Sequence, residues 1–208
     1  IHETGHEWWG NSITTNDIAD MWIHEGFCTY SEALYVECIY GYDQMLEYVN
    51  NQKRFIRNKS PIVGCYHVNH QGSGDMYQKA SVMLHTLRTL INDDQLWFSI
   101  IREISDNFKY KTINASDIMT FIMQRTEKDL TVFFSQYLNN SDLPEFQYQL
   151  IKEGRNTTIK YRWEAIDMFD MPLLVNSGNE DFWIYPNNSW KEMSLGKIDS
   201  REFSVKEE

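Results

Sequence analysis

The chain has 208 residues, of which 42% are hydrophobic, 14% aromatic and 24% charged, and its formal net charge is −11. This composition is typical of a globular protein with a sizeable core and excludes a disordered chain. The negative charge argues against binding nucleic acid, which requires clustered Lys and Arg, and no apolar run approaches the roughly 18 residues of a membrane span. The three cysteines are too few and too irregularly spaced for a disulfide framework or a CxxC zinc site.

The sequence begins at Ile1, inside a pattern that predicts a helix, and carries neither an initiator Met nor a signal peptide. We therefore interpret it as a piece of a longer protein whose N-terminal domain is missing. Signals that direct localisation are expected in that upstream part.

The periodicity of apolar residues predicts a mainly helical domain over residues 1–142. After the first helix, a second is predicted from Asp20 to Ile39, ending at Gly41, and a third from Tyr42 to Arg57. Glycines and a proline predict a loop over residues 60–74. Further helices are predicted near residues 75–92, 94–108, 115–127 and 130–139.

The periodicity changes from helical to alternating after Pro144. Residues 146–151 and 158–163 alternate between apolar and polar side chains, with a turn at Gly154 between them. Shorter strand candidates follow at residues 173–176, 182–185, 190–193 and 202–205. Short strands separated by turn residues predict an antiparallel β-sandwich-like domain over residues 143–208. The expected fold class is therefore α+β, with a helical domain followed by a small β-sandwich.

Residues 2–6 form an H-E-x-x-H motif. Positions i and i+4 of a helix lie on one face, so His2 and His6 can bind one zinc ion. Glu3 lies beside them, towards the position that a catalytic zinc leaves open for water. Because this motif is short and arises by chance, two surface histidines on a helix are an equally valid interpretation of it alone.

Glu25 supplies a third candidate ligand. Eighteen residues separate it from His6, enough for a connection and an antiparallel helix that returns to the same metal. Two His and one Glu leave the fourth position of Zn²⁺ open, which is the catalytic arrangement. A solvated carboxylate is the alternative, but Trp22, Ile23 and Phe27 surround Glu25 with apolar side chains, where a carboxylate requires a cation.

Residues 1–140 resemble the gluzincin zinc aminopeptidases, the family of aminopeptidase N and leukotriene hydrolase. The resemblance is carried by the segment HETGHEWWGNSIT at residues 2–14 and by MWIHEGFCTYSEALY at residues 21–35. It implies the C-terminal part of a thermolysin-like catalytic domain, one Zn²⁺ bound by His2, His6 and Glu25, and peptide substrates. It is also consistent with the β-rich domain that follows, since a β-sandwich follows the catalytic domain in several members of the family.

The resemblance extends to residues 77–81 (YQKAS), which match a Tyr-x-Lys-Gly/Ala segment of the family. It implies that Tyr77 donates a hydrogen bond to the developing oxyanion, a role in which a preorganised donor lowers the barrier. By the residues alone, Tyr77 is an ordinary aromatic residue near the start of a helix, and it is one of twelve tyrosines in the chain. The implied mechanism is hydrolysis by a zinc-activated water, with Glu3 as the general base that later protonates the leaving amine.

Other polar residues near these motifs have weaker functional interpretations. Glu32, two turns after Glu25, is either an acceptor that orients His2 or His6 or a solvated carboxylate. His24 points away from Glu25 on its helix and is not expected to bind zinc. His67 and His70 are interpreted as loop residues near the mouth of the site rather than as a second metal site.

The sequence leaves two alternatives to an aminopeptidase open. One is a gluzincin of other specificity, such as an endopeptidase or an epoxide hydrolase, because the Gly-x-Met-Glu-Asn segment with which the family recognises a free amino group would lie upstream. The other is an inactive interaction domain that retains the fold. Intact Glu3 and three intact ligands argue against the latter. The expected function is therefore that of a zinc aminopeptidase, and this piece alone is expected to turn over slowly or not at all because part of the cleft wall would lie upstream.

Overall fold

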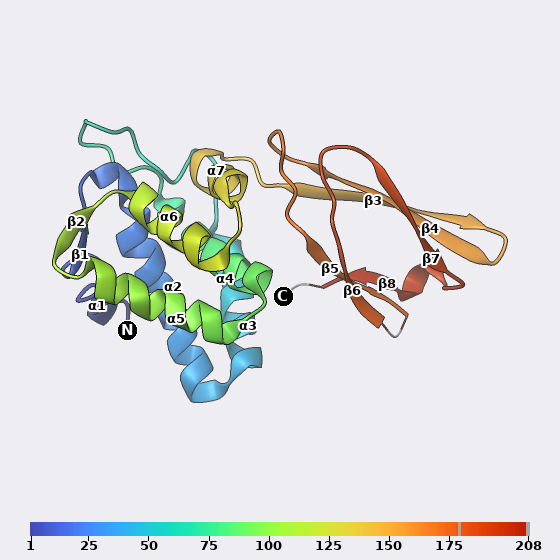
Figure 1. Ribbon diagram of the computed structural model, residues 1–208, viewed down its shortest axis with the longest axis horizontal. Helices are drawn as coiled ribbons and strands as arrows, with labels where there is room; N and C mark the ends of the chain where they lie inside the picture. The colour runs from blue at the N-terminus through green and yellow to red at the C-terminus, as the bar shows by residue number, and fades with distance from the viewer. Residues whose placement is uncertain (179, 207–208) are drawn as a thin grey trace. The chain divides into compact units, whose positions relative to one another are not determined.

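The computed structural model describes residues 1–178 and 180–206 and divides into two compact units, Ile1–Ser141 and Asp142–Glu208. The first unit is helical and the second is built of strands (Figure 1). The predicted α+β fold class is confirmed. No helix within the described residues is long and apolar enough to cross a membrane.

Helices of the first unit follow the predicted periodicity closely. They are α1 (His2–Gly5), α2 (Trp22–Tyr40), α3 (Tyr42–Gln52), α4 (Gln78–Ile91), α5 (Asp94–Phe108), α6 (Ala115–Thr126) and α7 (Thr131–Asn139), joined in part by the 3-10 turns η1 (Ile18–Asp20), η2 (Lys53–Phe55) and η3 (Gly74–Met76). The helix predicted from Tyr42 to Arg57 is shorter than expected, because α3 ends at Gln52 and the chain tightens into η2. Short 3-10 turns at helix ends are common and have no distinct apolar period.

Recognisable end signals fix two of these helices. Gly41 follows α2 with a φ of 92°, a left-handed value that a residue with a Cβ rarely adopts. Asn114 and Asp117 form a capping box at the start of α6, in which each side chain accepts from the backbone N–H of the other residue. The end at Gly41 was predicted from the residue type alone.

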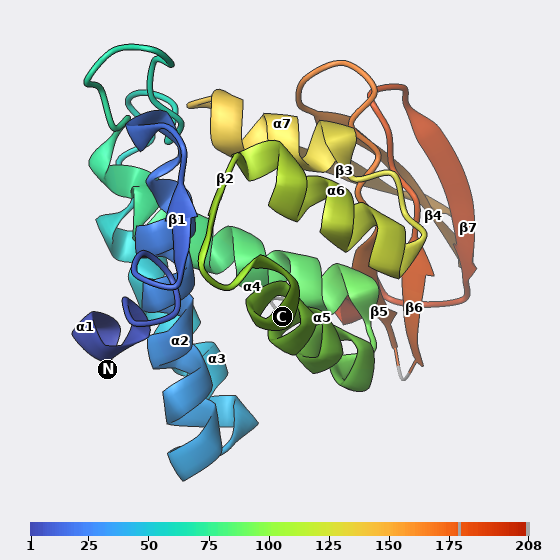
Figure 2. The same cartoon turned by 60° about the vertical axis from the view of Figure 1, so that its left-hand side comes forward.

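The central helix of this unit is α4. It contacts α2, α3, α5 and α7, and most of its side chains are buried. The turned view shows α4 running behind α5 and α6 and beside α2 and α3 (Figure 2). Its first residues, after η3, therefore lie at a position that α2 and α3 determine by packing.

A small parallel sheet in the helical unit was not predicted. β1 (Ile13–Thr15) pairs with β2 (Lys111–Ile113), so that Ile13 lies opposite Lys111. Strands of three residues are too short to show an alternating pattern, and their pairing joins segments nearly 100 residues apart. The pairing fixes the chain between α1 and α2.

The second unit contains two three-stranded antiparallel sheets. One has the order β3 (Glu145–Glu153), β4 (Asn156–Glu164), β7 (Lys191–Gly196), and the other the order β6 (Glu180–Ile184), β5 (Leu173–Ser177), β8 (Phe203–Val205). Both sheets contribute to one core, which contains Ile159 and Tyr161 from β4 together with Val175, Ile184 and Phe203. Two sheets that share a core form the predicted sandwich.

Candidate metal centre

The short helix α1 presents His2 and His6 to one side. The Gly5 N–H donates to the Ile1 carbonyl at 2.9 Å, which closes the turn between them, and the two imidazole rings lie 5.0 Å apart. Gly5 faces α2, where a Cβ would lie 3.1 Å from the Cys28 Sγ. A small residue at position 5 therefore allows α1 to approach α2 closely.

Helix α2 places Glu25 in its first turn. The preceding turn is fixed by Asp17, whose side chain accepts from the Ala19 N–H at 2.9 Å. Trp22 and Ile23, in the same turn of α2, are fully buried and anchor its orientation. A carboxylate at a helix N-terminus is also favoured by the helix dipole.

The three candidate ligand residues converge. The Glu25 Oε2 lies 3.0 Å from His2 Nε2 and 3.5 Å from His6 Nε2, and one ligand atom from each residue lies within 4.8 Å of the others. Their side chains are partly exposed, at 22%, 26% and 16% for His2, His6 and Glu25. Two imidazole nitrogens and a carboxylate oxygen that face one point, and remain accessible from one side, fit a catalytic Zn²⁺.

Each imidazole is oriented by an acceptor on its second nitrogen. His2 Nδ1 lies 2.8 Å from Glu32 Oε1, and His6 Nδ1 lies 3.1 Å from the Trp9 carbonyl oxygen. A carboxylate and a carbonyl can only accept, so these two contacts favour a proton on each Nδ1, and a metal ion that replaces the contacts with Glu25 then meets the lone pair of each Nε2. This is the tautomer that metal binding requires, and the Glu32 hydrogen bond is the one considered from the sequence.

Tyr48 extends this arrangement and was missed in the sequence. Its hydroxyl, on α3, donates to Glu32 Oε2, the carboxylate oxygen that does not contact His2. Burial raises the pKa of Tyr48 to about 12, with smaller contributions from the hydrogen bond and charge of Glu32. The phenol is therefore a permanent donor at neutral pH. No sequence motif links Tyr48 on α3 to His2, so the hydrogen bond between Tyr48 and Glu32 becomes visible only in the packing of α2 on α3.

Cys28 and His24, the neighbours of Glu25 on α2, have other roles. The buried Cys28 Sγ lies 3.3 Å from His6 Nδ1, and burial, with the charges of Glu25 and Glu3, raises the pKa of its thiol to about 12. The thiol is therefore neutral and packs behind the His6 ring. His24 Nε2 accepts from the Thr15 N–H at 3.0 Å, which ties the end of β1 to α2.

Tyr77 reaches the same site from the start of α4. Its ring lies 5.9 Å from the His2 ring, and burial, followed by the negative charge of Glu25, raises the pKa of Tyr77. The phenol therefore keeps its proton at neutral pH and can donate. Its position depends on a close crossing of α2 and α4, since a Cβ on Gly26 would lie 2.5 Å from the Ala80 Cβ.

Glu3 is exposed on α1, between the two histidines in the sequence. Its negative charge is near enough to contribute to the raised pKa values of both Tyr77 and Cys28. Glu3 thus lies on the same side of the helical unit as the candidate ligands, with a carboxylate accessible to solvent and to substrate.

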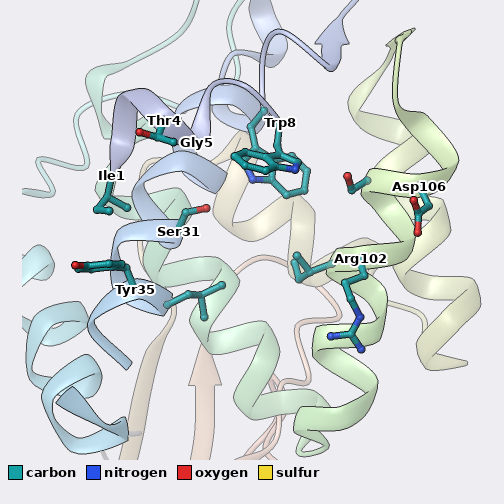
Figure 3. A pocket seen from close by; sticks show the side chains of 12 residues that line it. Ile1, Thr4, Gly5, Trp8, Ser31, Tyr35, Arg102 and Asp106 are labelled. Carbon is teal, nitrogen blue, oxygen red and sulfur yellow. The ribbon is translucent and has the colours of Figure 1, made fainter. Parts of the chain in front are cut away.

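Two hollows border α1 on different sides. One of about 210 Å³ has Tyr48, Thr29 and Phe55 in its wall together with His2 and Tyr77. The other, of about 580 Å³, lies between α1, α2 and α5; the close-up shows Trp8, in the turn after α1, and Tyr35 on α2 in its wall, with Arg102 on α5 across from them (Figure 3). The first hollow adjoins the candidate metal centre, since His2 and Tyr77 line it, whereas His6, Glu25 and Glu3 are not part of its wall.

The two loop histidines have local partners. The His67 N–H donates to Asp17 Oδ2 at 2.7 Å, and His70 Nδ1 accepts from the Cys65 N–H at 3.2 Å. The first contact holds the loop over residues 60–74 near η1, and the second lies within the loop.

A helical unit in which an H-E-x-x-H helix and a glutamate of the following helix converge on one point belongs to the gluzincin class of metallopeptidase domains. The model of the family described as the peptidase family M1 domain matches residues 1–137. The chain therefore belongs to peptidase family M1.

Relatives with curated descriptions are aminopeptidases at low identity. Aminopeptidase RNPEPL1 from Homo sapiens is 23% identical over 133 residues, which cover 57% of this chain and 18% of that protein. Aminopeptidase N from Lactococcus lactis subsp. lactis is 22% identical over 165 residues, which cover 73% of this chain and 19% of the relative. The chain thus spans about a fifth of the length of these relatives.

Solved structures of the same fold include the Legionella pneumophila aminopeptidase A in complex with aspartic acid. It matches with a TM-score of 0.72 at 16% identity, covering 95% of this chain and 24% of that one. An M1 zinc metallopeptidase mutant from Deinococcus radiodurans, bound to a Tyr-Ser-Ala substrate, matches with a TM-score of 0.59 at 19% identity, covering 70% of this chain and 33% of that one.

Proposed function

We propose that the protein containing this chain is a zinc-dependent aminopeptidase that removes N-terminal residues from peptides. The observation that carries the proposal is the convergence of His2, His6 and Glu25, whose ligand atoms lie within 4.8 Å of one another. The orientation of both Nδ1 atoms towards acceptors supports it, because this leaves both Nε2 lone pairs for one metal ion.

In this proposal His2, His6 and Glu25 hold the zinc. A bound Zn²⁺ supplies Lewis-acid activation of a water molecule and of the scissile carbonyl. Glu3 accepts the proton from the attacking water and passes it to the leaving amine, a role that its exposed carboxylate beside His2 permits. The protonated Tyr77 hydroxyl donates to the carbonyl oxygen as negative charge develops there.

The exopeptidase specificity is supported by the printed names of the relatives, which are aminopeptidases. In an aminopeptidase, the substrate has one residue before the scissile bond. The proposal therefore requires a free α-amino group on the substrate.

The metal requirement is tested on the full-length protein by elemental analysis and by adding a chelator. We expect about one zinc per chain, and loss of peptide cleavage on chelation that added Zn²⁺ restores. A purified protein without zinc that still cleaves peptides would contradict the proposed metal centre.

The role of Glu3 is tested with Glu3→Gln, which retains the shape of the side chain and removes the base. We expect kcat to fall by about 100-fold or more while zinc content is unchanged. Glu7→Gln is the matched control, since Glu7 is also exposed and lies one turn further along. Unchanged kcat in Glu3→Gln would remove Glu3 from the proposal.

Specificity is tested by comparing a peptide with its N-acetylated form. An aminopeptidase cleaves the free peptide and leaves the acetylated one intact. Equal cleavage of both would identify an endopeptidase instead, and turnover of an epoxide without peptide cleavage would identify an epoxide hydrolase.

A further inference from the structure

A third hollow, which we call the outer hollow, adjoins the one that borders His2 and Tyr77, which we call the inner hollow. It has a volume of about 590 Å³, compared with about 210 Å³ for the inner hollow. Phe55 and Gln78 belong to the walls of both, so the two hollows lie side by side. The outer hollow is therefore a neighbour of the hollow that His2 and Tyr77 border.

The wall of the outer hollow carries cationic and hydroxyl groups. Arg57, Lys59 and Ser60 come from the segment after η2, and Ser73 comes from the start of η3. The Ser73 Oγ is buried and, within the described residues, has no hydrogen-bond partner. Cations and an unused hydroxyl donor around one space are the groups that bind a carboxylate.

Asp75 is the acidic side chain in this wall, and each of its carboxylate oxygens accepts a hydrogen bond from the backbone. Its Oδ1 accepts from the Arg57 N–H at 2.9 Å and its Oδ2 from the Asn58 N–H at 2.7 Å. These bonds fix the main chain of the segment that carries Arg57. The carboxylate thus holds the cationic segment in place while both of its oxygens are already engaged.

The side chains of Arg57 and Lys59 differ from the paired cations elsewhere in the chain. Arg88 forms an ion pair with Glu37 at 2.6 Å, and Arg125 forms one with Glu103 at 2.6 Å. Across residues 1–178 and 180–206, neither Arg57 nor Lys59 has a recorded ion pair, and both are exposed. In a chain of net charge −11, two adjacent unpaired cations in a hollow favour an anionic ligand.

We propose that the outer hollow binds a carboxylate on the leaving part of the peptide substrate, through Arg57 and Lys59. The inference rests on the proposed aminopeptidase function. In such an enzyme one residue precedes the scissile bond, so a site beyond the inner hollow faces residues that follow it. The carboxylate is either the C-terminal group of a tripeptide-sized substrate or the side chain of an acidic residue near the cleavage point.

The experiment compares kcat/KM of the full-length enzyme for Ala-Ala-Ala with a free C-terminus and for the same peptide as its amide. A second pair, Ala-Ala-Asp-Ala-amide and Ala-Ala-Asn-Ala-amide, isolates the side-chain source. We expect the carboxylate form to be preferred about 10-fold in at least one pair, and the preference to shrink with added salt. Equal kcat/KM within both pairs would overturn the proposal.

The variant that tests the residues is Arg57→Gln combined with Lys59→Gln. It should abolish the preference for the carboxylate form, so that kcat/KM of this variant is the same for the free-acid and amide peptides. Lys53→Gln combined with Arg54→Gln is the matched control, because these two cations are also exposed and lie just upstream in η2, outside the wall of the hollow. If the first variant still prefers the carboxylate form, other residues cause the preference and the inference is contradicted.

Binding measurements separate this inference from the proposed function. Calorimetry on the zinc-loaded Glu3→Gln protein should show tighter binding of Ala-Ala-Ala than of its amide, even though this variant does not turn over. If the wild-type enzyme cleaves neither peptide but this difference in affinity persists, the proposed activity fails and the carboxylate site stands. If the wild-type enzyme is active but the two affinities are equal, the proposed activity stands and the carboxylate site fails.

Discussion

At the residue scale, a chain of hydrogen bonds connects the candidate metal centre to the packing of α3 against α2. Tyr48 donates to one oxygen of Glu32, and the other oxygen lies 2.8 Å from His2 Nδ1. Without the Tyr48 hydroxyl, the Glu32 carboxylate has fewer constraints on its rotamer. The His2 ring then loses part of its orientation, and the zinc complex loses preorganisation.

Tyr48→Phe should therefore weaken zinc binding without unfolding the protein. We expect the dissociation constant for zinc to rise by about 10-fold, at the lower end of the effect of residues that orient a ligand. Competition with a chromogenic chelator measures it. Tyr40→Phe, at a 68% exposed tyrosine, is the control that should leave zinc affinity unchanged. Equal affinity in both variants would show that Glu32 is held without Tyr48.

The residues of the candidate site differ in how far the sequence predicts them. The pairing of His2 with His6 follows from helical spacing, and Glu25 follows from a motif in an apolar setting. Tyr77 is indicated by family resemblance and not by any local pattern. Tyr48 and the Trp9 carbonyl had no signal at all, because their roles depend on which atoms the tertiary packing places against Nδ1.

At the element scale, the crossing of α2 and α4 determines where Tyr77 lies. An added Cβ on Gly26 would meet the Ala80 Cβ at 2.5 Å and the Met76 carbonyl oxygen at 3.3 Å. Because α4 also packs against α3, α5 and α7, a shift of α4 away from α2 would disturb these contacts. The small residues at positions 26 and 80 therefore set the distance between the helices that carry Glu25 and Tyr77.

Gly26→Ala should destabilise the helical unit by about 1–3 kcal/mol, the usual cost of overpacking a core, and lower activity by moving Tyr77. Urea denaturation and kcat measure the two effects. Adding Ala80→Gly should restore part of both, since it removes the opposing methyl group. Gly74→Ala is the control for stability, because a Cβ there meets nothing within 4 Å. A Gly26→Ala variant as stable as wild type would contradict the tight crossing.

Elements of the structure were predictable where a local period or end signal exists. The helices α2, α5, α6 and α7 lie at the predicted positions, and Gly41 ends α2 as expected. The pair β1 and β2 was not predicted, since its stability comes from a neighbour far away in the chain. The same reason explains the early end of α3, where packing and not periodicity decides between an α-helix and a 3-10 turn.

At the scale of the whole molecule, the β-rich unit has a core that its own strands supply. Strand β4 buries every second side chain, and Ile159 on it is fully buried with Val175 on β5. Further apolar side chains from β3 and β7, including Phe146 and Met193, pack against this core. We propose that residues 142–208 form a domain that folds independently of the helical part.

Residues 142–208, expressed alone, should unfold cooperatively in urea with a free energy of a few kcal/mol, as expected for a core of this size. Circular dichroism and the dispersion of amide NMR signals measure it. Val175→Asp should abolish the transition, because it places a charge at a fully buried position shared by both sheets. Tyr185→Ser, at a 64% exposed tyrosine, should leave it unchanged. A non-cooperative transition with collapsed NMR dispersion would show that this unit requires the helical part in order to fold.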